Sequence, residues 1–283
     1  YSFLSPDLPG NEGTFRAVTI VAPEGTLVNP RPPAPMTMNT IAVATEIIHA
    51  VWQALGQADP ARACAFWGKN SGPIMSGLGD DGKPFVMYHW SGAIGAGAVD
   101  GRDGFNANGG LVALGRLQLP DVELYEQSYP VRFVRQEFRP DAGGPGRFRG
   151  GTATDYVVDI ETTGSLSLRG EGLRTPSGKG ARGGGTGVAG DMRITYPDGR
   201  EVLPPKYGLV AVEPMRLQVI AAGGGGWGDA FTRDPERVLR DVRDGIVTRE
   251  AALRDYGVDL TPDGRAVDAA ATEQRRAPFA SSG

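Results

Sequence analysis

Glycine is the feature that most restricts what this chain can fold into. The 283 residues include 43 glycines and 22 prolines, and three dense glycine runs lie at residues 143–151, 183–187 and 223–228. So much glycine and proline would indicate a low-complexity chain if it were spread evenly, but apolar segments separate the glycine runs here. The sequence therefore predicts a globular protein rich in loops and strands. The glycine runs can either wrap a ligand closely or simply permit tight turns between strands, and the sequence leaves both open.

Short apolar segments between the glycines predict the strands. A β-branched segment at residues 14–22 is typical of a buried strand that ends at a turn. A hairpin connection is expected around Pro197 and Gly199, because proline presets one turn angle and glycine accepts a positive φ. Further short strands are predicted at residues 85–90, 131–138, 153–161, 165–169, 192–196, 208–213 and 216–221.

Helices are expected towards both ends of the chain. Residues 39–55 carry apolar side chains at spacings of three and four, and Gly56 is a suitable end. Asp234 can cap a C-terminal helix whose first residue is proline, and Thr248 can cap a second. The predicted fold class is α+β, a glycine-rich mixed β core with a helix near the N-terminus and two short C-terminal helices.

The organisation of the chain is predicted to be simple. No polar linker precedes Thr261, so residues 1–260 are expected to form one domain. Residues 261–283 are polar, rich in alanine and without periodicity, and we expect a flexible tail there. The chain begins without Met and soon enters a strand-like segment, which we interpret as a fragment or as one product of a split gene.

Composition excludes several classes of protein. Cys64 is the single cysteine, which excludes an internal disulfide framework and a cysteine-based zinc site made by this chain alone. The net charge of −4, with both signs interspersed, gives no electrostatic footprint for nucleic acid or an anionic membrane. No apolar run approaches the ~20 residues of a membrane span, and no signal-peptide pattern occurs at the start. We therefore expect a cytoplasmic protein without nucleic-acid or membrane partners.

Nucleotide-binding signatures are absent or out of context. Residues 185–190 (GTGVAG) match the spelling of a dinucleotide-binding loop. No apolar strand precedes them, however, and a strand-like segment rather than a helix follows, so the context is wrong. No Walker A sequence occurs either, so the chain by itself gives no support for ATP binding.

Side chains suited to metal or nucleophilic chemistry are scattered. His49 lies on the polar side of the predicted helix, and His89 lies in a predicted strand beside a glycine loop. A structural role is favoured for both, because neither has further ligands at metal-binding spacing. Cys64 lies among apolar neighbours, which favours a buried, inert thiol.

The acidic segment at residues 121–126 offers two interpretations. Glu123 and Glu126 are three apart, a spacing that puts two acids on one face of a helical turn. Such a pair can serve acid–base chemistry or pair with arginines. A salt-bridged or N-capping turn is favoured over a catalytic pair.

Several motifs, taken together and in order, resemble the hydantoinase B/oxoprolinase family. The resemblance extends over nearly all of residues 9–260. Its motifs are residues 11–16 (NEGTFR), 22–30 (APEGTLVNP), 126–130 (EQSYP), 139–151 (RPDAGGPGRFRGG), 167–170 (SLRG), 223–229 (GGGGWGD) and 233–248 (RDPERVLRDVRDGIVT). They look like the C-terminal half of the family's B-type subunit.

The resemblance implies an activity shared between subunits. Family members are ATP-dependent hydrolases of hydantoins, 5-oxoproline or lactams, or ketone carboxylases. The resemblance implies a hydantoinase A-like ATPase partner that holds ATP and Mg²⁺ and phosphorylates a small-molecule substrate. It also implies a divalent metal in the N-terminal half of the subunit, so no metal ligand or cofactor is assigned to this chain. A ketone carboxylase subunit and a non-catalytic scaffold subunit remain the alternatives.

Three residues are candidates for lining the shared active-site region, while the catalytic residues themselves stay unassigned. Asp103 follows a glycine loop, Glu126 belongs to a family-like motif, and Arg169 ends a predicted strand that can aim it at an anionic group. For each of them a structural role is an equal alternative.

Overall fold

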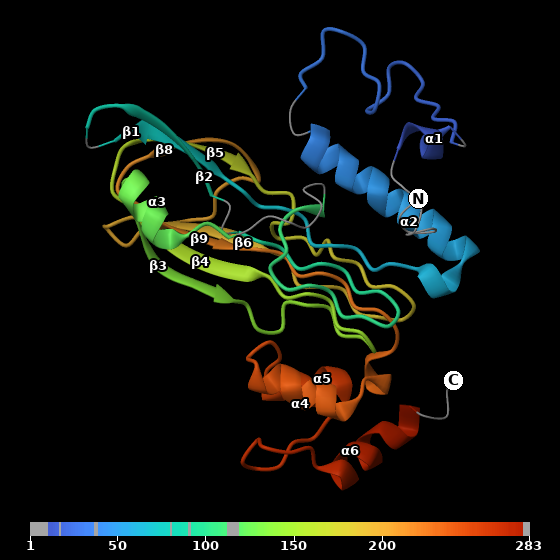
Figure 1. The fold of residues 1–283 in the computed structure, drawn as a ribbon. Helices are drawn as coiled ribbons and strands as arrows, with labels where there is room; N and C mark the ends of the chain where they lie inside the picture. Colours follow the sequence, from blue (N-terminus) through green and yellow to red (C-terminus); the bar gives the residue numbers. More distant parts are fainter. Residues whose placement is uncertain are drawn as a thin grey trace. The chain divides into compact units, whose positions relative to one another are not determined.

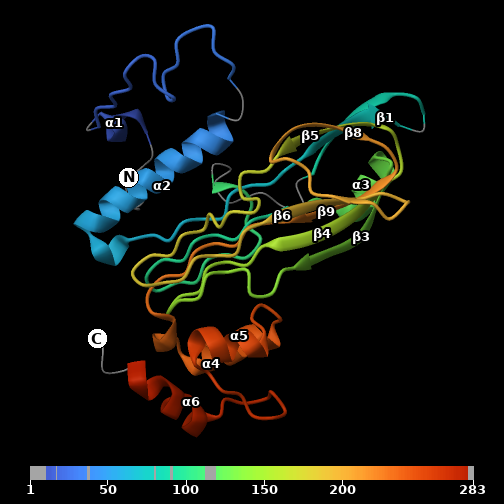
Figure 2. The same ribbon diagram turned by 180° about the vertical axis from the view of Figure 1, so that it is seen from behind.

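The computed structural model describes residues 11–16, 18–36, 39–79, 81–89, 92–111 and 119–279. The chain divides into two compact units, Tyr1–Ala63 and Cys64–Gly283, where the sequence led us to expect one domain up to residue 260. Figures 1 and 2 show the elements of each unit.

The first unit is helical where it is described. It contains α1 (Glu12–Phe15), a π-helical turn (Asn39–Val43), α2 (Ala44–Ala58) and a 3-10 turn (Pro60–Arg62). Helix α2 agrees with the predicted amphipathic helix. His49, predicted on its polar side, is instead buried, with its ring centroid 5.9 Å from that of Trp52.

The strand predicted at residues 14–22 is wrong for the residues that are described there. Helix α1 occupies its start, and residues 18–22 are not in a strand. Ile20 and Val21 are 86% and 79% exposed. A β-branched segment needs a partner strand and burial to become a strand, and the described part of this unit supplies neither.

The described part of the second unit contains two antiparallel sheets and the helices α3–α6. One sheet has the order β2-β1-β5-β8 and the other β3-β4-β9-β6-β7. Their strands are β1 (Ile74–Leu78), β2 (Pro84–Tyr88), β3 (Val131–Phe138), β4 (Thr154–Ile160), β5 (Gly164–Arg169), β6 (Asp191–Thr195), β7 (Glu201–Val202), β8 (Tyr207–Val212) and β9 (Met215–Ile220). The α+β class is confirmed, and the strand predictions from residue 131 onward lie within about two residues of the observed strands. Trp90, at the end of another predicted strand, lies outside the described residues.

A shared apolar core joins the two sheets. It includes Met75 and Leu166 from one sheet and Tyr156, Ile194 and Leu217 from the other, all fully buried. Alternate residues of a strand point to opposite faces, so each sheet turns one face inward and one outward. Strand β1 was not predicted, because Ser76 and Gly77 interrupt its apolar pattern.

The glycine runs form an array of loop segments between the sheets and the C-terminal helices (Figure 1). Backbone hydrogen bonds link them, for example Gly224 N–H to Gly151 O at 3.0 Å and Gly144 N–H to Gly224 O at 2.8 Å. A Cβ on Gly224 would overlap the backbone of Ala96, and many other glycines of the array meet a neighbouring backbone in the same way. As in collagen, only glycine fits where backbones pack this closely, so the glycines are packing residues as well as turn residues.

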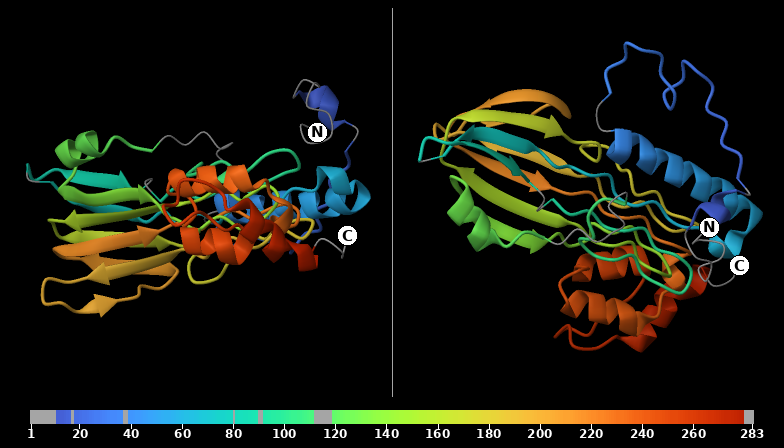
Figure 3. Two further views of the ribbon diagram at one scale, coloured as in Figure 1. Left: turned by 90° about the horizontal axis from the view of Figure 1, so that it is seen from below. Right: turned by 45° about the horizontal axis from the view of Figure 1, so that its top comes forward.

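The C-terminal region, as far as it is described, contains three helices where two were predicted. They are α4 (Pro235–Arg243), α5 (Arg249–Tyr256) and α6 (Ala269–Arg276), flanked by 3-10 turns at Ala230–Thr232 and Ala277–Phe279. Asp234 and Thr248 cap α4 and α5 as expected. Helix α6 lies in the predicted tail, where Asp268 caps it and Thr272 is buried. Figure 3 shows the three helices, in orange and red, gathered beside the glycine array.

Candidate functional site

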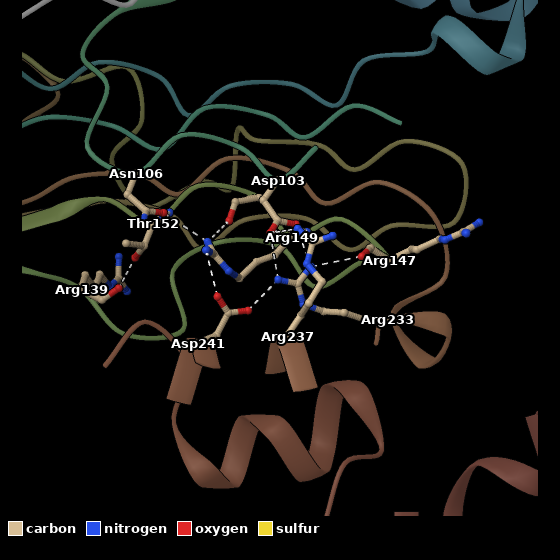
Figure 4. A network of polar contacts seen from close by, with 10 residues as sticks. Asp103, Asn106, Arg139, Arg147, Arg149, Thr152, Arg233, Arg237 and Asp241 are labelled. Carbon is tan, nitrogen blue, oxygen red and sulfur yellow. Dashed lines mark hydrogen bonds and ion pairs between the residues drawn. The ribbon is translucent and has the colours of Figure 1, made fainter. Parts of the chain in front are cut away.

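Asp103 is the centre of a buried ion-pair network (Figure 4). Its carboxylate accepts two hydrogen bonds from the Arg233 guanidinium, at 2.7 and 2.9 Å, and one from Arg237 at 2.7 Å. It also accepts one from the backbone N–H of Arg149 at 2.7 Å. Asp103 is therefore fully occupied by protein donors, although the sequence placed it among the candidate substrate-lining residues.

Helix α4 supplies the second acid of the network. Asp241 accepts from Arg233 at 2.7 Å and from Arg149 at 3.3 Å. Arg149 also donates to Asn106 Oδ1 at 3.2 Å and to the carbonyl of Gly150 at 2.6 Å. The network thus ties the loop around Asp103, the glycine run 143–151 and helix α4 into one body.

The protonation of this network is fixed by its geometry. Burial alone would raise the pKa of Asp103, but the hydrogen bonds and charges of Arg233 and Arg149 outweigh it and hold that pKa below the ordinary value. Burial alone would lower the pKa of Arg233, but Asp103 and Asp241 raise it. Neither group exchanges a proton near neutral pH, so the arrangement suits a structural role rather than acid–base catalysis.

Glu126 lies on helix α3 (Val122–Ser128). Asp121 caps this helix by accepting from Glu123 N–H at 2.9 Å, which confirms the N-capping interpretation of the acidic segment. Glu126 Oε1 accepts from Phe133 N–H at 2.6 Å. The residue borders a cavity of about 350 Å³ that is also lined by Asp81 and Glu161. Three acids therefore line this cavity, and one of them, Asp81, is paired with Lys83 at 2.7 Å.

Arg169 is the last residue of β5 and lies opposite Tyr207 in β8. Its side chain makes no hydrogen bond or ion pair with the described residues, whereas the neighbouring Tyr207 donates to Glu171 at 3.0 Å. In the described part of the chain no hydrogen bond or ion pair joins Arg169, Glu126 or Asp103 to one another. Their assignment to a shared site stays a prediction.

A second polar group, around His89, lies inside the core. His89 is 2% exposed, and its ring stacks on Tyr156 at a centroid distance of 6.2 Å and an interplanar angle of 11°. Both His89 ring nitrogens, the Tyr156 hydroxyl and the Ser71 hydroxyl lack a hydrogen-bond partner among the described residues. Burial lowers the pKa of His89 to about 4, so its ring is neutral at pH 7. Sequence reasoning singled out His89 but could not foresee Tyr156 beside it.

The remaining sequence candidates are resolved by their surroundings. Burial raises the pKa of Cys64 to about 11, so the thiol is protonated at neutral pH and a poor nucleophile. Strand β6 rather than a helix follows residues 185–190, so this loop lacks the dinucleotide-binding context. Among the described residues, no group of three or more His, Cys, Asp or Glu side chains could hold a metal ion. None of the described helices combines the length and apolarity needed to cross a membrane.

These features define an α+β chain organised around a glycine array that an ion-pair network joins to helix α4. Residues 1–230 match the hydantoinase B/oxoprolinase family, and the chain belongs to that family.

Three comparisons place the chain within the family. It is 36% identical to the beta subunit of caprolactamase from Pseudomonas jessenii over 95% of this chain and 48% of that protein. It is 32% identical to the B subunit of a putative D-/L-hydantoinase from Pseudomonas sp. (strain NS671), over 95% of this chain and 45% of that protein. The crystal structure of ATP-dependent caprolactamase from Pseudomonas jessenii matches with a TM-score of 0.82 and 33% identity, over 98% of this chain and 50% of that one. The chain therefore spans about half the length of these relatives.

Proposed function

We propose that this chain is part of the B-type subunit of an ATP-dependent enzyme that opens cyclic amides such as lactams, hydantoins or 5-oxoproline. The similarity to caprolactamase carries this proposal, because it holds in both sequence and structure and covers almost the whole chain. Related members that act on hydantoin and 5-oxoproline, by name, support the same class of reaction.

The proposal divides the chemistry between polypeptides. We infer that ATP and Mg²⁺ are held by an ATPase-type partner subunit and that a divalent metal is held by the other half of the B-type subunit. The match of residues 1–230 to the family supports this division, and the sequence has no Walker A loop. This chain would contribute the rigid glycine array and the sheets that shape the shared site.

The test is turnover by the native complex. The complex containing this chain is purified from its source and supplied with ATP and caprolactam, hydantoin or 5-oxoproline. The proposal expects ring opening coupled to ATP hydrolysis, and little activity from the isolated chain. ATP hydrolysis that needs a ketone and bicarbonate instead of a cyclic amide would contradict it and identify a ketone carboxylase.

A variant series separates a contribution to the site from a scaffold role. Arg169→Ala and Glu126→Ala are compared with Arg254→Ala, an exposed control on helix α5. If Arg169→Ala or Glu126→Ala assembles normally but loses turnover while the control keeps it, the substituted residue belongs to the active site. Unchanged turnover in all three would favour a scaffold.

A further inference from the structure

The outer face of the four-stranded sheet is almost free of charge. Tyr88, Ile74, Ser167 and Leu209 lie side by side across β2, β1, β5 and β8, and Val86, Ser76, Ser165 and Ala211 form the next row. These side chains point away from the core, because their neighbours along each strand are the core residues. Leu209 is 73% exposed and Val86 is 56% exposed.

Two serines at the centre of this outer face pair with each other. Ser76 and Ser165 share a hydrogen bond of 3.1 Å. Arg169 is the one charged side chain in these strand positions, and it has no ion-pair partner among the described residues. The surface therefore offers apolar area, a paired serine centre and one unpaired cation at its margin.

The outer face of the other sheet provides an internal comparison. Its strands carry ion pairs across the surface, including Arg216 with Asp159 at 2.7 Å and Arg135 with Asp155 at 2.8 Å. Gln218 donates to Asp155 beside them. That sheet has the ordinary surface of a strand layer facing water, with opposite charges paired between strands. The difference between the two outer faces is therefore local and is not a property of the whole composition.

We propose that the outer face of the β2-β1-β5-β8 sheet is the docking surface for the half of the B-type subunit that this chain does not span. The match to the caprolactamase structure covers 98% of this chain but only 50% of the caprolactamase chain. The caprolactamase chain is therefore about twice as long. A second body of similar size therefore belongs to a subunit of family length. The uncharged face fits such a permanent contact, because obligate interfaces are more apolar than transient ones.

The unpaired Arg169 adds a chemical requirement to this contact. Removing a guanidinium from water at the margin of an apolar contact is costly unless an acidic group pairs with it. We infer that the docking half presents a carboxylate to Arg169. This inference rests on the proposed function for the identity of the partner half, whereas the uncharged outer face is observed independently of that function.

The test introduces a charge on the face and measures assembly. Leu209→Asp and Val86→Asp lie on opposite edge strands of the sheet, and Leu203→Asp, 60% exposed outside the strands, is the matched control. The remaining half of the subunit is supplied as a separate polypeptide, and native mass spectrometry reports how much of it each variant binds. Thermal unfolding of each isolated chain checks that the sheet still forms. We expect at least a tenfold loss of association for the two face variants, no loss for the control and unchanged unfolding of the isolated chains.

Each result has a distinct meaning. Normal assembly of both face variants would overturn the inference, and if such a complex still opens cyclic amides, the proposed function stands without it. Lost assembly of both face variants in a complex whose unaltered form opens no cyclic amide would support the inference and contradict the proposed function. An unaltered chain that self-associates in isolation, and loses this property in Leu209→Asp, would overturn the inference by showing that a second copy covers the face.

Discussion

Replacing Asp103 with alanine tests the idea that the ion-pair network holds helix α4 on the glycine array. The Arg233 side chain is 1% exposed, and the substitution leaves it with Asp241 as its remaining acidic partner. Arg237 can turn to solvent because its side chain is 35% exposed, but the Arg149 N–H loses its acceptor. Breaking a buried ion pair costs about 3–5 kcal/mol. Since Asp241 still compensates part of the Arg233 charge, we expect a loss near the lower end, about 3 kcal/mol.

Urea unfolding of the isolated chain measures this loss. With a slope of about 2–3 kcal/mol per molar urea, the midpoint should fall by roughly 1–1.5 M. The control is Arg254→Ala, which removes an exposed pair with Asp255 and should cost less than about 1 kcal/mol. If Asp103→Ala and Arg254→Ala unfold at the same urea concentration, the network does not stabilise the fold and the reasoning fails.

The pH dependence of the same difference provides a second readout. The pKa of Asp103 is held below its ordinary value of 3.8, so the unfolded chain binds the proton more readily than the folded chain. The stabilisation by Asp103 is therefore present above about pH 4 and is lost as the pH falls through the lowered pKa. The difference in unfolding free energy between wild type and Asp103→Ala should shrink below pH 4.

Two further predictions concern the array and the core. The Cβ added by Gly224→Ala would overlap the backbone of Ala96, so this variant should lower the free energy of unfolding by roughly 3 kcal/mol or more. The control Gly110→Ala adds its carbon in open space and should change the free energy of unfolding by less than about 1 kcal/mol. Equal urea midpoints for the two variants would contradict the packing role of Gly224. The pKa of His89 is about 4 in the folded chain, below its ordinary value of 6.5. Between these two pH values the unfolded chain binds a proton that the folded chain does not. The free energy of unfolding should therefore fall as the pH drops from 6.5 towards 4, by on the order of 3 kcal/mol in total. His89→Leu should abolish this dependence, and NMR of the two histidine rings would contradict the reasoning if the His89 ring titrated near pH 6.5.

The amino-acid sequence determined the local features of this protein. The alternating apolar segments from residue 131 onward predicted their strands, because alternation along a strand matches one buried face. The helix starts at Asp234 and Thr248 were predictable because capping is an interaction with backbone two or three residues away. The order of the family-like motifs along the chain was also sufficient to predict the family.

Tertiary structure decided which of these features became core, surface or site. Asp103 and Arg233 are 130 residues apart in sequence, so no local pattern could predict that they pair. The described residues of the segment 14–22 have strand-forming side chains but no partner strand, whereas β1 has two partners despite its interrupted pattern. Periodicity and capping depend on neighbours along the chain, but strand pairing and ion pairing depend on which distant segments the fold brings together. The nearly uncharged outer face shows the same distinction, because its residues come from four strands and form one surface only when the sheet assembles.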